Sequence, residues 1–195
     1  MTAELTPTTP DFVATLTKVA AARNRNVNRP SAVAVVDALL QAEKVAKQQR
    51  LVYPLESLFG CWQLCFTAPR KAHLQNGVAL GKGFYVPQFA PAQISFGAQT
   101  LSNQIKFGSL LFKLTGSIKY LGKKNLLAFD FNHVQLSLFG RTVYSGDFRG
   151  GKLRAVDFYN QSIAKLPFFA FFLVTEDFIA ARGRGGGLAL WVKVS

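Results

Sequence analysis

In the stretch LFKLTGSIKY, from Leu111 to Tyr120, apolar and polar side chains alternate with a period of two. One face carries Phe112, Leu114, Ile118 and Tyr120, and the other carries Lys113, Thr115, Ser117 and Lys119. Successive side chains of a β-strand point to opposite faces, so the pattern predicts a strand with one buried and one solvated face. We expect the apolar face to point into the core and both lysines to point into water.

Further strand-sized segments lie on both sides of this one. They are GCWQLCFT, AQISFGA, NQIKF, LLAFDFNHVQLSL, TVYSGDF, LRAVDFY, FFAFFLV and LALWVKV. Within LLAFDFNHVQLSL the apolar side chains change from odd to even positions, which predicts a β-bulge near Asn132 or His133. Glycine-containing turn signals separate the segments at hairpin spacing. Eight or nine short strands of this kind predict a closed or nearly closed antiparallel β-barrel.

Positions 10–48 follow a helical period instead. Phe12, Leu16 and Val19 recur at helical spacing, and Val36 and Leu40 continue the pattern after the basic turn RNRNVNR. A helical hairpin is the expected result. The predicted fold is therefore mainly β, with an N-terminal helical segment at 1–50 and a barrel domain at 51–195.

Positive charge is unevenly distributed along the chain. The formal net charge is +13, and no acidic residue occurs between Glu56 and Asp130. Such a surface attracts nucleic acid, an anionic membrane or an acidic protein, and composition does not choose among them. The residues predicted to face a membrane are Lys113, Lys119, Lys123 and Lys124. Binding of this kind is reversible, and salt releases it.

The stretch RGRGGG, residues 182–187, has three possible interpretations: an RNA-binding box, a phosphate cradle or a hinge. It occurs once and runs directly into the alternating strand LALWVKV, whereas a phosphate cradle is followed by a helix. Single-strand binders also need exposed aromatics beside basic residues, and the sequence offers no such pattern. We interpret the stretch as a glycine hinge between two strands, and nucleic-acid binding is disfavoured.

Residues suited to catalysis are scarce. The two histidines, His73 and His133, are interpreted as a surface-loop residue and a structural residue. Glu176 and Asp177 are adjacent, so on a strand they point to opposite faces and cannot act as a carboxylate pair. We predict a non-enzymatic protein without a cofactor.

Cysteine content, hydropathy and the N-terminal stretch give four further expectations. Cys61 and Cys65 are too far apart on one strand for a disulfide, and they lack the further ligands of a zinc site. We therefore expect free thiols and no metal. No apolar run reaches the roughly 18 residues of a membrane-spanning helix. The N-terminal stretch MTAELTPTTPDF lacks the features of a secretory signal.

Two motifs at opposite ends of the barrel region carry a family resemblance. LFGCWQLCFT, with Gly60 and Trp62, resembles the G-x-W opening strand of lipocalin-like barrels. Together with TEDFIAARGRGGGLALWV it resembles the plastid lipid-associated protein (fibrillin) family of plastids and cyanobacteria. The resemblance covers roughly Leu51 to Ser195. It implies a lipocalin-like barrel that binds an isoprenoid, carotenoid, quinone or other lipid, peripheral at a thylakoid membrane and linked to photoprotection or lipid homeostasis. A photosynthetic protein partner is also implied.

The resemblance also suggests roles for individual residues. The candidate cavity-lining residues are Trp62, Leu64, Phe66, Phe112, Leu114, Ile118, Tyr120, Phe129 and Phe131. Gly60 and Arg182 are structural candidates, because such barrels set a late-strand arginine against the G-x-W tryptophan. Asp177 is either an anchor for a ligand head group or a surface carboxylate. Trp191 lies opposite the more apolar face of its strand, so we expect it under the helices.

Alternative functions remain open at this level. The same apolar residues could fill the barrel, which would leave a membrane-associated scaffold. Barrels of this shape also attach bilins to antenna proteins, although that activity needs polar groups inside the barrel.

Overall fold

The computed structural model describes residues 11–22, 29–70, 72–75, 78–147 and 155–194. The helices are α1 (Asp11–Ala21), α2 (Ala32–Gln49) and α3 (Ala155–Asn160), with 3-10 turns η2 (Leu55–Leu58), η3 (Gly122–Lys124) and η5 (Ile163–Lys165). The strands are β1 (Gly60–Ala68), β2 (His73–Gln75), β3 (Val78–Leu80), β4 (Phe84–Tyr85), β5 (Ala92–Phe96), β6 (Thr100–Phe107), β7 (Leu110–Leu121), β8 (Leu126–Leu138), β9 (Arg141–Asp147), β10 (Phe168–Val174), β11 (Phe178–Gly183) and β12 (Leu188–Lys193).

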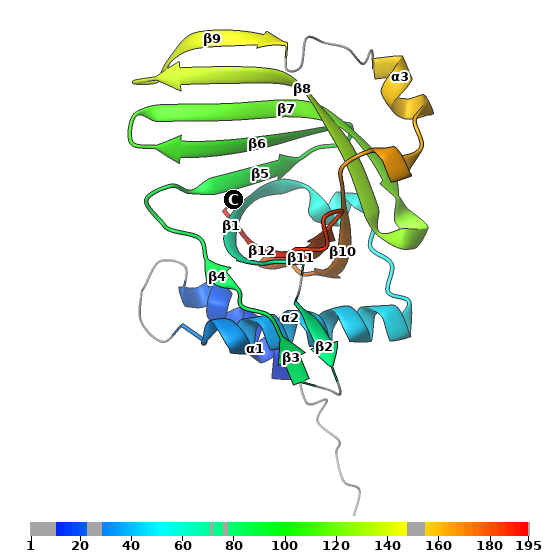
Figure 1. Cartoon of the computed structure of the whole chain (residues 1–195). Helices are drawn as coiled ribbons and strands as arrows, with labels where there is room; N and C mark the ends of the chain where they lie inside the picture. The colour runs from blue at the N-terminus through cyan, green and yellow to red at the C-terminus, as the bar shows by residue number, and fades with distance from the viewer. Residues whose placement is uncertain (1–10, 23–28, 71, 76–77, 148–154, 195) are drawn as a thin grey trace, which may run out of the picture.

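Eight of these strands form a closed antiparallel barrel, which appears end-on as a ring in Figure 1. The pairing order is β1-β5-β6-β7-β8-β10-β11-β12, and β12 returns to β1 with Trp62 opposite Lys193. Neighbours in the barrel thus follow chain order, as in the up-and-down barrels of lipocalin type. The expected mainly β, lipocalin-like barrel with an N-terminal helical pair is confirmed.

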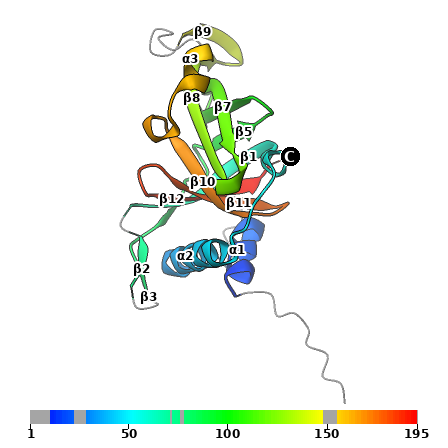
Figure 2. The same cartoon turned by 90° about the vertical axis from the view of Figure 1, so that its right-hand side faces the viewer.

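The helical pair covers one outer side of the barrel (Figure 2). α2 begins after Ser31, whose hydroxyl accepts a hydrogen bond from the Ala34 amide at 3.2 Å. Its buried side, which includes Val36 and Leu39, belongs to one hydrophobic cluster with Phe66 and the outer side chains of β11 and β12. These barrel strands are therefore buried on both faces.

A bulge interrupts the pairing of β7 with β8. Thr115 pairs with His133 and Gly116 pairs with Phe131, so Asn132 is the extra residue. The bulge predicted near Asn132 or His133 is confirmed. It marks the place where β8 leaves the barrel.

β8 has different partners before and after this bulge. Residues 126–128 pair with β10 and close the barrel, whereas residues 133–138 pair with β9. Figure 1 shows β6, β7, β8 and β9 running together past the ring. We call this part of the sheet the arm.

Two local predictions had different outcomes. The hinge at RGRGGG is confirmed, because β11 ends at Gly183, β12 begins at Leu188 and Gly186 has a φ of 85° between them.

The strand expected at LRAVDFY is wrong: residues 155–160 form α3, and residues 153–154 lie outside the described ranges. Phe158 anchors this short helix in a small apolar cluster, so one buried side chain replaces the expected alternation.

Within the described ranges, no helix has both the length and the apolar character needed to cross a membrane.

Candidate functional site

Aromatic side chains fill the middle of the barrel. Trp62 and Trp191 are 0% and 5% exposed. The ring of Phe169 stacks on Phe129 with centroids 5.0 Å apart and meets Trp191 edge-on at 5.3 Å. Aromatic pairs of this kind contribute about 0.5–1.5 kcal/mol each beyond the area they bury. This part of the barrel is a packed core.

The inner side chains at the end of the barrel next to the arm are less completely buried, and we call this end the mouth. The strand register brings Leu64, Leu114, Phe131, Phe169 and Ala189 to the inner face at this end, and all five are half-buried. Asn103 lies opposite Leu114 on the same face and adds an amide. Half-buried apolar side chains with a polar group at their edge have the composition of a site for a small hydrophobic molecule.

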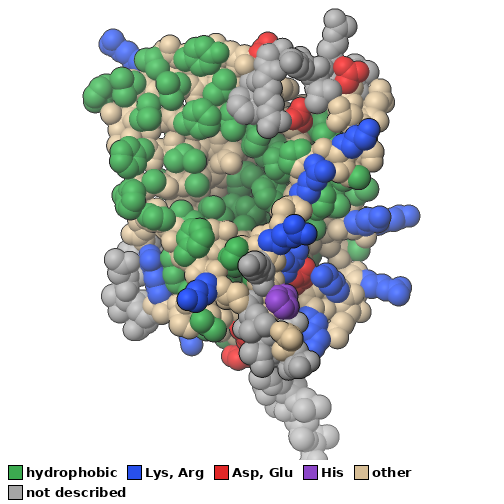
Figure 3. Space-filling view, viewed as in Figure 1, with side chains coloured by type: hydrophobic (Ala, Val, Ile, Leu, Met, Phe, Trp, Pro, Cys, Tyr) green, Lys and Arg blue, Asp and Glu red, His purple; other side chains and the backbone are tan. Residues whose placement is uncertain are grey.

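The inner face of the barrel continues onto one side of the arm, which we call the apolar face. Directly paired residues of antiparallel strands share a face, and Ile105, Phe112 and Leu136 are paired in this way across β6, β7 and β8. Six large side chains of this face are 37–60% exposed: Ile105, Phe107, Leu110, Phe112, Leu138 and Tyr144. Figure 3 shows apolar side chains spreading over β6–β9 and continuing into the centre of the view. A contiguous exposed apolar surface marks an interaction or ligand-binding site.

The opposite face of the arm is polar. Gln135 donates a hydrogen bond to Thr142 Oγ1 at 3.0 Å, and His133 Nε2 lies 3.0 Å from Ser145 Oγ. The arm is thus amphipathic, with one face suited to water and one suited to an apolar partner.

Tyrosine and asparagine side chains close the other end of the barrel. Tyr120 Oη donates to the Tyr53 carbonyl at 2.8 Å, and the Tyr53 amide donates to Asn125 Oδ1 at 2.9 Å. Asn125 also donates through Nδ2 to the Leu51 carbonyl at 2.7 Å. Burial, together with nearby Tyr53 and Glu56, raises the pKa of Tyr120 to about 12.

This raised pKa predicts a loss of stability at alkaline pH. Unfolded Tyr120 titrates near pH 10, whereas folded Tyr120 keeps its proton up to about pH 12. Because the folded pKa is the higher one, the associated stability is complete below pH 10 and is lost as the pH rises through 12. Urea unfolding across this range should show a smaller decline for Tyr120→Phe than for the wild type. Equal declines would contradict the prediction.

The structure distributes most of the predicted cavity residues along the inner face. Leu64, Leu114 and Phe131 are at the mouth, Trp62, Ile118 and Phe129 are in the packed core, Tyr120 is at the closed end, and Phe112 is on the apolar face. The same face of β7 thus runs from buried to exposed surroundings.

Phe66 lies outside the barrel, so the prediction that it lines the cavity is wrong. β1 shifts register against β12 between Leu64, which pairs with Trp191, and Phe66, which pairs with Leu190. The extra residue, Cys65, reverses the alternation. Phe66 is fully buried beneath α2.

The expectation for Trp191 is also wrong. Leu188, Leu190 and Val192 pack under the helices, whereas Trp191 points into the barrel. Because β12 is buried on both faces, the more apolar face of its sequence does not identify the interior.

Arg182 points away from the barrel interior and towards α2. Its Nε donates to Glu43 Oε1 at 2.9 Å, and its Nη2 donates to Oε2. The prediction that Arg182 lies against Trp62 is wrong, because the cation over that ring is Lys193, with Nζ 5.1 Å from the centroid. Burial raises the pKa of Glu43, but hydrogen bonds and charge from Arg182 and Lys47 outweigh it and hold this pKa below its ordinary value.

Gly60 and Asp177 lie at positions with plain structural roles. Gly60 begins β1 with a φ of 119°, which favours glycine. Asp177 is exposed in the β10–β11 turn, where its carbonyl accepts a hydrogen bond from the Lys193 amide at 2.8 Å. This location corresponds to a surface carboxylate and is remote from the mouth.

The predicted membrane-facing lysines are divided among three places. Lys113 lies on the polar face of the arm, and Lys119 donates to the Tyr159 carbonyl of α3 at 2.8 Å. Lys123 and Lys124 line a groove of about 300 Å³ beside the C-terminal end of α2. A second groove, of about 480 Å³, lies between α2 and β2 and is lined by Lys44, Lys47, Arg70, His73 and Arg182 among others.

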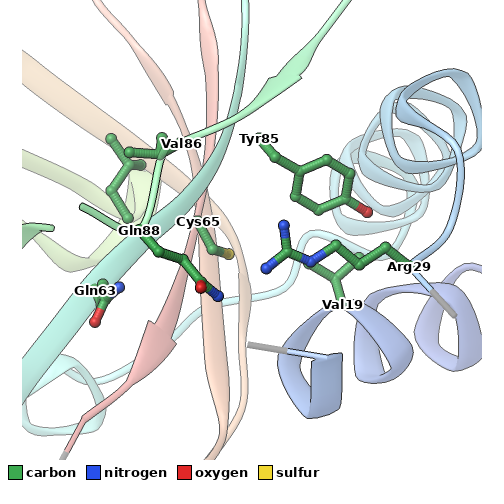
Figure 4. Close-up of a pocket in the computed structure, with 8 residues that line it drawn as sticks. Val19, Arg29, Gln63, Cys65, Tyr85, Val86 and Gln88 are labelled. Atoms are coloured by element: carbon green, nitrogen blue, oxygen red, sulfur yellow. The ribbon is translucent and has the colours of Figure 1, made fainter. Parts of the chain in front are cut away.

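A small cavity lies where α1 approaches β1 and β4 (Figure 4). The Arg29 guanidinium is 5.2 Å from the centroid of the Tyr85 ring, and Tyr85 Oη donates to the Pro30 carbonyl at 2.8 Å. The volume of this cavity, about 20 Å³, suits one water molecule and excludes an organic ligand.

Sequence reasoning missed several residues of the mouth and the apolar face. They are Asn103, Ile105, Phe107, Leu110, Leu136, Leu138, Tyr144, Phe169 and Ala189. The sequence feature that could have identified some of them is the turn at 107–110, which contains Gly108. Extending the alternation of LFKLTGSIKY across it would have assigned Phe107 to the inner side.

The fold and the site together define a small lipocalin-like barrel with a half-buried apolar mouth. No family model matches the chain. No curated protein matches it either. Among solved structures, the chain is similar to a lipocalin-like protein from Bacteroides uniformis ATCC 8492, with a TM-score of 0.44 and 12% identity over 71% of this chain and 99% of that chain.

Proposed function

We propose that the protein binds a small hydrophobic molecule at the mouth and catalyses no reaction. The observation that carries this proposal is the continuity of the half-buried mouth with the exposed apolar face. A long apolar ligand such as an isoprenoid, carotenoid, quinone or other lipid can lie along the apolar face with one end in the mouth. Asn103 can hydrogen-bond to a polar group on that end.

We further propose that binding occurs at an anionic photosynthetic membrane. The net charge of +13 favours such a surface. The resemblance to the plastid lipid-associated family, carried by Gly60, Trp62 and TEDFIAARGRGGGLALWV, supports a thylakoid setting and a role in photoprotection or lipid homeostasis.

A pair of lysine substitutions on adjacent residues of β7 tests ligand binding. Trp191 is close to Phe169 at the mouth, so a bound quinone should quench tryptophan emission. Leu114→Lys places a charge at the mouth and removes roughly 1.5–3 kcal/mol of apolar burial, which should weaken binding about tenfold or more. Thr115→Lys, on the opposite face, should bind the quinone as the wild type does.

A scaffold with a filled barrel is the second candidate, and the packed core favours it. It predicts that native mass spectrometry and solvent extraction of the purified protein find no apolar molecule. It also predicts that quinone leaves the tryptophan emission of the wild type unchanged. Either equal quenching of the two lysine variants or no quenching at all would contradict binding at the mouth.

A further inference from the structure

The far end of the arm carries two hairpin turns that expose large apolar side chains. The β6–β7 turn spans residues 107–110, and the β8–β9 turn spans residues 138–141. Phe107 is 60% exposed and Phe139 is 80% exposed. The Phe139 amide donates to the Ser109 carbonyl at 3.0 Å, so the two turns are held side by side. We call this pair of turns the tip.

A third phenyl ring extends the tip. Phe89, from the loop between β4 and β5, meets Phe107 edge-on with centroids 6.3 Å apart and is itself 72% exposed. Phe139 has a φ of 49°, a conformation in which glycine and asparagine are favoured over bulky residues. Neither the local backbone nor packing therefore accounts for an aromatic side chain at this position.

The charges around the tip are positive. Lys106 and Arg141 flank the two turns, and both are exposed. Within residues 78–147 the acidic residues are Asp130, which is on the barrel side of the bulge, and Asp147, which is at the opposite end of β9 from the tip. Exposed phenyl rings beside cations complement a bilayer surface, where the rings enter the apolar boundary and the cations meet anionic headgroups.

We propose that the tip is the part of the protein that inserts into an anionic lipid bilayer, with Phe107 and Phe139 in the acyl boundary and Lys106 and Arg141 at the phosphates. The inference rests on the membrane setting of the proposed function and identifies its contact surface. In this orientation the apolar face leads from the bilayer to the mouth, so a lipid-soluble ligand moves between them without crossing water.

A tryptophan placed in the tip tests insertion directly. Both native tryptophans are buried, so the Phe139→Trp variant adds an exposed reporter to a constant background. With vesicles of phosphatidylcholine and phosphatidylglycerol in equal parts, its emission should shift to the blue, and brominated acyl chains should quench it. The control is Phe84→Trp, at a side chain that is 59% exposed on β4, and it should show neither effect.

A second set of variants separates the tip from the lysines near α2. Phe139→Asn suits the left-handed backbone, so it should keep or raise the melting temperature while reducing vesicle co-sedimentation at least several-fold. Lys123→Glu with Lys124→Glu should leave co-sedimentation unchanged.

The possible failures are distinguishable. Vesicle binding by the wild type without quenching of the Phe139→Trp variant overturns insertion of the tip and leaves the membrane setting intact. If the wild type does not bind vesicles, both the insertion of the tip and the membrane setting are overturned. Quenching of tryptophan emission by a quinone still tests ligand binding at the mouth in that case. A wild-type dimer that Phe139→Asn dissociates would assign the tip to a second copy of the chain and overturn the proposal.

Discussion

The Gly116→Ala variant should be less stable than the wild type by about 3 kcal/mol, at the upper end of the usual cost of overpacking. A Cβ atom at this position would overlap the backbone carbonyl oxygen of Asp130 and lie 2.8 Å from the Cα of Phe131. Backbone atoms of a paired strand cannot turn aside as a flexible side chain can. The bulge would have to open, and the barrel wall would open with it. Urea unfolding followed by circular dichroism measures the change.

Gly185→Ala is the matched control for this substitution. Gly185 lies in the β11–β12 turn, and no atom lies within 4 Å of the Cβ position. Its stability should stay within about 0.5 kcal/mol of the wild type. Equal midpoints for the Gly116→Ala and Gly185→Ala variants would show that the bulge accepts a methyl group, and the argument would fail.

Arg182→Ala should also destabilise the fold strongly, by about 2–4 kcal/mol, because it leaves the Glu43 carboxylate buried without its main partner. The Arg182 side chain is 24% exposed and that of Glu43 is 10% exposed, so water screens the pair only in part. Arg184→Ala is the control: Arg184 is exposed and donates to the Lys165 carbonyl at 2.9 Å, and its loss should cost less than about 0.5 kcal/mol. Equal melting temperatures for the two variants would contradict the prediction.

The stability difference between the wild type and Arg182→Ala should depend on pH, because the pKa of Glu43 is shifted in the folded state. In the wild type the folded pKa lies below the unfolded value, so the stabilisation is present above the unfolded pKa and is lost as the pH falls through the folded pKa. Without Arg182, only Lys47 opposes the effect of burial, so this pKa rises relative to its value in the wild type. The stability gap between wild type and Arg182→Ala should therefore narrow on acidification. Adding Glu43→Gln to Arg182→Ala removes the buried charge and should recover part of the lost stability at neutral pH.

The sequence predicted the barrel and its bulge because both leave a local signal. Alternation placed Ile118 and Tyr120 on the inner face, and the change of phase in residues 126–138 predicted a bulge near Asn132 or His133, which the structure has at Asn132. A period of two identifies a face but carries no information about depth. It could not show that Phe112, on the same face as Ile118, lies beyond the end of the barrel.

The errors at Phe66, Trp191 and Arg182 all concern strands that the helical pair covers. The helical pair covers the outer surface of β1, β11 and β12, so both faces of these strands are apolar and hydrophobicity no longer separates inside from outside. A single extra residue, Cys65, then reverses the direction of Phe66. The Arg182–Glu43 pair joins residues from the two predicted domains, and a sequence alone does not specify such a contact.

The pairing of β1 with β12 also has a consequence for biosynthesis. β1 obtains β5 as a neighbour early, but its other edge waits for β12, whose Lys193 pairs with Trp62. Until the ribosome has released that segment, an apolar strand edge stays open, and such edges recruit other chains. The separation between the paired strands also makes closure slow compared with the local hairpins. The barrel thus stays unclosed while the segment between β1 and β12 is synthesised, and this is the interval in which a holdase chaperone would be of most use.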